Sequence, residues 1–129
     1  MSKNTPISTE HQTFESLKHT VEGSEFWYAR ELQSVLDYSR WEKFERVIKR
    51  AIKACEGSGQ PSEDHFPQVV KMVEIGSGAQ RSSSDYQLSR YACYLIVQNA
   101  DASKAVIANG QTYFAIQTRR QELKADTGF

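Results

Sequence analysis

The stretch RWEKFERVIKRAIKAC, residues 40–55, has the periodicity of an amphipathic helix. Its apolar residues recur at steps of three and four, which places them on one side of a helix: Trp41, Phe44, Ile48, Ala51, Ile52 and Cys55. The opposite side carries Lys43, Arg46, Arg50 and Lys53. The sequence therefore predicts a long helix with one face in the core and one basic face.

Charge is distributed unevenly along the chain. The stretch 40–55 contains six basic and two acidic residues, a sum of +4, whereas the whole chain of 129 residues sums to zero. The remainder therefore carries −4. A zero net charge argues against a protein that coats nucleic acid with its whole surface, but it leaves room for a local basic patch. The basic face is either an anion-binding surface or a solvated surface of the kind that many amphipathic helices have.

A shorter helix precedes this one. Residues 29–37 form a one-sided pattern, and Tyr38-Ser39 breaks it. Ser39 is expected to cap the long helix, with Glu42 completing a capping box. Helix, short turn and long helix together are the helix-turn-helix pattern, which serves DNA recognition but also occurs in helical hairpins that touch no DNA.

The flanking segments predict strands and two more helices. Residues 25–28 suit a strand, whereas the pattern from Phe14 to His19 fits a short helix or a strand. Residues 57–64 are expected to form a loop, 66–75 one or two strands, 76–85 a turn, 88–100 a buried helix and 102–124 a last helix capped by Asp101.

These elements predict a mostly helical α+β domain, with a helix-turn-helix-like hairpin and a small β-hairpin. Its predicted boundaries are 14–124, with a disordered lead-in at 1–13 and a tail at 125–129.

Several basic residues are candidates for contact with DNA phosphates. The glycine-rich loop at 75–81 ends in Arg81 and could present N–H groups to a phosphate as a wing, although a plain hairpin tip is the favoured explanation. The loop lacks the Lys-Ser/Thr ending of a nucleotide-binding loop. The predicted DNA-binding residues are Arg40, Lys43, Arg46, Arg50, Lys53, Arg81, Arg119 and Arg120.

The sequence shows no pattern for catalysis, a metal or a cofactor. The three histidines have no metal-ligand spacing, and no nucleophile has a base nearby in sequence. Cys55 and Cys93 lie in apolar helical patterns, which favours buried, reduced thiols and a cytoplasmic location. No segment has the apolar length of a membrane helix. Arg90 is expected either exposed at a helix start or buried against a carboxylate such as Asp85.

Four segments of the chain resemble a known family. They are WYARELQSVLDYSRWEKFERVIKRA (27–51), CEGSGQPSEDHF (55–66), MVEIGSGAQRSSSDYQLSRYACYLIVQNAD (72–101) and GQTYFAIQTRRQEL (110–123). Their order resembles that of bacterial DNA-damage-inducible protein D, whose N-terminal part is similar to the Bro-N domain of antirepressor-like phage proteins. The resemblance covers about residues 14–123. Members are usually about twice this length, so the chain is expected to correspond to a truncated relative or an N-terminal domain.

The resemblance implies a Bro-N-like fold that binds DNA, induction in the SOS response and an effect on a RecA-type recombinase. A homodimer is a further possibility, because helix-turn-helix modules often pair. The alternative function is an antirepressor-like module that binds a recombinase or a repressor without contacting DNA. By resemblance, the positions of most interest are Arg30, Tyr38, Ser39, Arg40, Trp41, Gln80, Arg81, Arg90, Arg119 and Arg120.

Overall fold

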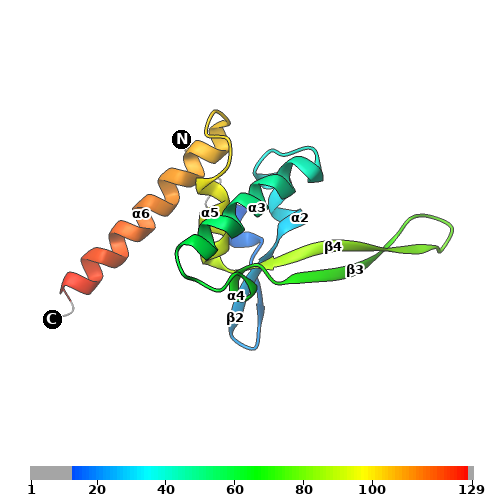
Figure 1. The fold of residues 1–129 in the computed structure, drawn as a ribbon, viewed down its shortest axis with the longest axis horizontal. Coiled ribbons are helices and arrows are strands. Elements are labelled where there is room, and N and C mark those ends of the chain that lie inside the picture. Colours follow the sequence, from blue (N-terminus) through cyan, green and yellow to red (C-terminus); the bar gives the residue numbers. More distant parts are fainter. Residues whose placement is uncertain (1–12, 128–129) are drawn as a thin grey trace, which may run out of the picture.

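The structure, a computed structural model, describes residues 13–127, and the side chains as far as residue 120. After a helical turn at 13–16, the elements follow in the order β1 (His19–Val21), β2 (Ser24–Tyr28), α2 (Ala29–Val35), α3 (Trp41–Gly57), α4 (Ser62–His65), β3 (Gln68–Glu74), β4 (Gln80–Leu88), α5 (Arg90–Gln98) and α6 (Ala105–Thr127) (Figure 1). The predicted α+β fold is confirmed. Residues 1–12 of the predicted lead-in lie outside the described residues.

One antiparallel sheet joins the strands in the order β1-β2-β4-β3. Strand β2 meets β4 only through the pairs Trp27–Leu88 and Tyr28–Gln87, whereas β3 and β4 pair all the way from Gln68–Tyr86 to Glu74–Gln80. Within residues 13–127, most of the β3–β4 hairpin therefore has no third strand beside it. We call this hairpin, residues 68–88, the β3–β4 arm, and Figure 1 shows it projecting from the helical body.

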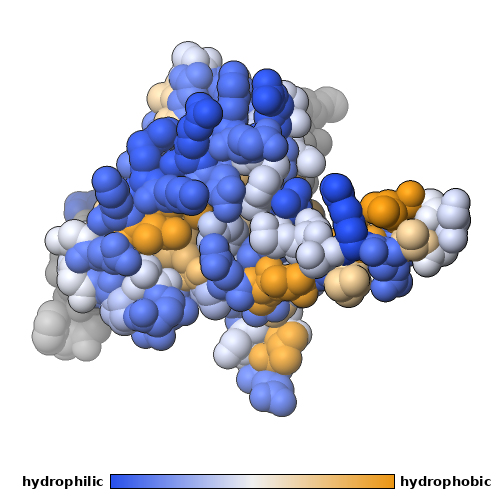
Figure 2. Space-filling model, turned by 45° about the vertical axis from the view of Figure 1, so that its right-hand side comes forward, coloured by the Kyte–Doolittle hydropathy of each residue, from blue (hydrophilic) through white to orange (hydrophobic). Residues whose placement is uncertain are grey.

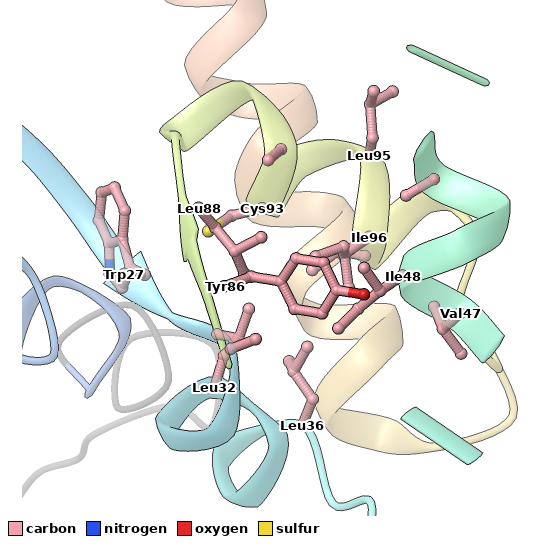
Figure 3. Packing of buried hydrophobic residues seen from close by; sticks show 14 of the residues in the cluster. Trp27, Leu32, Leu36, Val47, Ile48, Tyr86, Leu88, Cys93, Leu95 and Ile96 are labelled. Atoms are coloured by element: carbon pink, nitrogen blue, oxygen red, sulfur yellow. The ribbon is translucent and has the colours of Figure 1, made fainter. Parts of the chain in front are cut away.

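The core lies where α2, α3 and α5 meet the base of the sheet. Figure 3 shows Tyr86 of β4 reaching from the sheet toward Ile48 of α3 and Ile96 of α5. All three side chains are almost completely buried.

Both cysteines are buried as predicted, with free thiols, and burial raises the pKa of each. Helix α6 packs on α5, and its C-terminal part extends away from the body (Figure 1).

Arg90 connects four elements. Its guanidinium donates to the carboxylates of Glu25 (Nε–Oε2, 2.8 Å) and Glu15 (Nη1–Oε2, 2.9 Å), and the Tyr113 hydroxyl of α6 donates to Glu15 (2.6 Å). The hydrogen bond from Arg90 lowers the pKa of Glu15, while burial and the neighbouring carboxylate raise the pKa of Tyr113 to about 12. Of the two roles expected for Arg90, the half-buried ion pair is correct, but its partners are Glu15 and Glu25 instead of Asp85.

The extent of β4 differs from the prediction. The segment 76–85 was expected to be a turn, but β4 begins at Gln80, and the turn is confined to residues 75–79. The serines at 82–84 carry no strand signal of their own. They are extended because the ladder with β3 satisfies their backbone groups, and the exposed ribbon requires no large apolar side chains there. Leu88, expected on a helix face, is the buried last residue of β4.

The predicted helix caps differ as well. Arg40, not Ser39, is the N-cap of α3, and no side-chain hydrogen bond caps it. Glu42 is then one position too early for a capping box. Asp101 accepts hydrogen bonds from the backbone N–H and hydroxyl of Ser103, so it closes a turn, and α6 begins only at Ala105. The predicted loop at 57–64 is interrupted by the short helix α4.

Candidate nucleic-acid interface

The basic face of α3 is solvent-exposed along its length. The exposed side chains are Lys43, Arg46, Lys49, Arg50 and Lys53, and those buried on the opposite side are Phe44, Val47, Ile48, Ala51 and Cys55. This confirms the predicted two-faced helix. Lys49 was counted in the charge of the stretch but not among the predicted contacts, and its exposure adds it to the face. Figure 2 shows a broad hydrophilic surface over this part of the body.

The carboxylates of α3 do not neutralise this face. Glu45 accepts a hydrogen bond from the Tyr86 hydroxyl (3.0 Å), and Glu56 accepts one from the Ser62 hydroxyl (2.8 Å). Glu42 lies 3.7 Å from Arg40. Within the described part of the chain, no carboxylate lies within 4.0 Å of the charged groups of Lys43, Arg46, Lys49 and Lys53. We call these four residues the α3 cationic row.

Two other predicted contacts on this segment have partners of their own. Arg50 donates from Nη2 to the carbonyl oxygen of Asn99 (3.1 Å), the residue that ends α5. A cation at this position also interacts favourably with the negative end of the α5 dipole. Arg40 pairs with Glu42, but both side chains are about 70% exposed, so this pair adds little stability. Arg50 therefore combines an exposed charge with a structural role.

The remaining predicted contacts lie away from α3. Arg81 is exposed on the β3–β4 arm, opposite Val73, roughly 17 Å along the strand from Tyr86, where the arm contacts α3. Arg119 and Arg120 are exposed on α6, which packs on the far side of α5 from α3 (Figure 1). The structure therefore gathers the α3 residues into one surface and leaves these three arginines outside it.

Asp85 organises the base of the arm, a role that no local sequence pattern indicated. Its carboxylate is 1% exposed, and Oδ1 accepts from the backbone N–H of Arg30 (3.1 Å) and of Tyr86 (2.8 Å). Oδ2 makes no hydrogen bond with the described residues, but the ammonium of Lys71 lies 3.4 Å from it. The same ammonium sits 3.3 Å from the centroid of the Tyr28 ring. The arm is therefore joined to the start of α2 by a buried charge.

We expect Asp85→Asn to lower the free energy of unfolding by about 1–2 kcal/mol, because the amide keeps one acceptor but loses the ion pair with the partly exposed Lys71. Urea denaturation provides the measurement. Lys71→Met leaves Asp85 charged and buried, so the double variant should be less destabilised than the sum of the two single variants. Additive losses would contradict a direct interaction.

Several residues of the α2–α3 hairpin that the family resemblance singled out hold α3 in place. The Arg30 guanidinium lies 4.1 Å above the Trp41 ring, and its Nε donates to the backbone oxygen of Ser84 (2.8 Å). The Tyr38 hydroxyl accepts from the backbone N–H of Asp101 (3.1 Å). These contacts attach the α2–α3 turn to the arm and to the segment before α6, so the orientation of the α3 cationic row is determined by the tertiary structure.

Among residues 13–127, no three side chains of the His, Cys, Asp and Glu types converge as a metal-binding group. None of the helices described combines the length and the apolar character required to cross a membrane.

Comparison with known proteins identifies the family to which the chain belongs. Residues 16–115 match the family described as BRO family, N-terminal domain (Bro-N). The chain belongs to the Bro-N family. It is also similar to the Escherichia coli (strain K12) protein named DNA damage-inducible protein D, with 53% identity over 124 residues.

That similarity spans 95% of this chain but only 45% of the relative, so the chain spans less than half the length of the relative. No solved structure matches the chain of this protein. The Bro-N match covers the whole α2–α3 hairpin, the arm and the first half of α6, and therefore contains the α3 cationic row.

Proposed function

We propose that this Bro-N domain is a non-catalytic DNA-binding module of the DNA-damage response, and that the α3 cationic row binds the phosphate backbone. The observation that carries the proposal is the row itself: four exposed cations on one helix face, with the carboxylates of the same helix engaged elsewhere. Such a face in a chain of zero net charge gives a localised attraction for a polyanion.

The helix-turn-helix interpretation accounts for the placement of α3. Helix α2 and helix α3 are separated by residues 36–40, and α3 packs on the core through its apolar face. In helix-turn-helix proteins the second helix enters the major groove and the first crosses the backbone. By this analogy the row would contact phosphates flanking the groove. Arg81, on the arm, would be an auxiliary contact, whereas Arg119 and Arg120 contribute less.

A role in DNA damage rests on the name of the relative and on the shared Bro-N domain. Because the chain covers less than half of that relative, induction by DNA damage and an effect on a RecA-type recombinase are both proposals for this chain.

The salt dependence of binding tests the proposal. Four phosphate contacts predict that log K for duplex DNA falls with log salt concentration with a slope of about −3.6. Fluorescence anisotropy with a labelled duplex, and with a labelled single strand of equal length, measures both slopes and shows which form binds more tightly. If neither the duplex nor the single strand binds at low salt, the proposal is refuted.

The zero net charge of the chain favours a second candidate, an antirepressor-like module that binds a recombinase or a repressor without DNA. A pull-down with a purified RecA-type recombinase, with and without nuclease, separates the two functions. Retention after nuclease treatment supports the protein interaction, and loss of the partner indicates that DNA bridges the two proteins.

A further inference from the structure

The outer edge of β3 has no strand paired with it in the described residues. β3 is last in the sheet order, and β4 is its partner. The hydrogen bonds Ile75 N to Ala79 O and Gln87 N to Pro67 O fix which residues of β3 direct their backbone groups toward β4. In an antiparallel ladder, successive residues direct their backbone N–H and C=O groups alternately toward the two neighbouring positions in the sheet. Residues 69, 71 and 73 therefore direct these groups toward β4, and Gln68, Val70, Met72 and Glu74 direct them outward.

The outward-directed residues also have exposed side chains. Val70 is 70% exposed and Met72 is 60% exposed, and Ile75 at the tip is 56% exposed. Figure 2 shows hydrophobic patches on the projecting arm. A two-stranded ribbon alone is marginally stable in water, and an uncovered apolar edge strand is a template for another strand. The arm therefore has the features of a strand that completes its pairing with a second chain.

The sequence of β3 indicates which strand fits. Its pattern is palindromic about Lys71: polar Gln68 and Glu74 at the ends, with valine or methionine at 69, 70, 72 and 73 between them. We propose that two copies of this chain associate by antiparallel pairing of β3 with β3, with Lys71 on the two-fold axis. In this register, Val70 of each copy lies opposite Met72 of the other copy. Gln68 of each copy likewise lies opposite Glu74 of the other, so each pair occurs twice in the dimer.

The charges of the arm favour a second copy over a nucleic acid. Lys71 and Arg81 are balanced by Glu74 and Asp85, so the net charge of the segment 68–88 is zero, and Arg81 offers a polyanion no more than an auxiliary contact. The register brings the two Lys71 residues together, but each is 3.4 Å from the Asp85 carboxylate of its own chain, which offsets their repulsion. In the four-stranded ribbon that results, Val70 and Met72 lie on one face, and Lys71 and Arg81 on the other.

Sedimentation velocity of the 129-residue chain without DNA, over a range of concentrations, measures the association independently of the proposed function. We expect a monomer–dimer equilibrium. Met72→Pro removes an outward N–H without removing a bond to β4, so it should raise the dissociation constant roughly thirtyfold, for two lost hydrogen bonds per dimer. Met72→Thr, which keeps the N–H, should raise it less. A wild-type monomer at all concentrations, or equal dissociation constants for Met72→Pro and the wild type, would overturn the proposal.

The register is tested by a matched pair of variants at an exposed position. Gln68→Lys should lower the dissociation constant and Gln68→Glu should raise it, each by roughly two- to thirtyfold, because the residue faces Glu74 of the other copy twice per dimer. Circular dichroism establishes that both variants are folded. Shifts of the two variants in the same direction would overturn the pairing.

Discussion

Replacing Arg46 and Lys53 by glutamate should lower the affinity for duplex DNA roughly a hundredfold, since two charge-assisted phosphate contacts are lost and two repulsive charges replace them. The salt slope should fall in magnitude by about 2. Both side chains are exposed and form no ion pair with a described carboxylate, so the fold should be retained. Fluorescence anisotropy at two salt concentrations gives both quantities.

The matched control is Arg119→Glu with Arg120→Glu, which changes the net charge by the same amount on α6. Because α5 lies between α6 and α3, this pair should weaken binding much less (Figure 1). An equal loss in the two double variants would show that net charge governs binding and that the α3 cationic row is not the site. Arg50 is left unchanged in both variants, since its contact with Asn99 would mix a loss of stability with a loss of binding.

Trp27→Ala should lower the free energy of unfolding by about 3–5 kcal/mol, the range for removal of a large aromatic side chain from a core. Trp27 is completely buried, and its ring stacks on Phe14 with centroids 4.5 Å apart. Its indole N–H donates to the backbone oxygen of Phe14 (2.8 Å). The loss of these contacts should free the helical turn at 13–16, and with it the carboxylate of Glu15 that holds Arg90 and Tyr113.

Urea denaturation measures this loss, and Trp27→Phe is the control. Phenylalanine keeps an aromatic ring but cannot donate the hydrogen bond to Phe14, so a smaller loss of about 1–2 kcal/mol is expected. Equal stability of Trp27→Ala and the wild type would contradict the central position of this side chain. DNA binding by Trp27→Phe should remain, since Trp27 is completely buried and is not part of the exposed face of α3.

The sequence by itself determined the helices whose periodicity is local. The alternation of apolar and basic residues in α3 repeats every three or four positions, so the buried and the exposed face were predictable, although Val47 and Lys49 were missing from the predicted sets. The same is true of α5, where apolar side chains nearly all round indicated the burial that is observed. The candidate site was predictable to the extent that it lies on one helix.

Only the tertiary structure decided the features that depend on distant partners. Arg90 finds its carboxylates 65 and 75 positions away, and Arg50 its carbonyl 49 positions away. The serines of β4 are extended because β3 pairs with them, and the edge of the arm is left without a described neighbour because β3 is last in the strand order. A local pattern reports the preference of a segment for water or for the core, whereas these pairings depend on which segments the fold brings together.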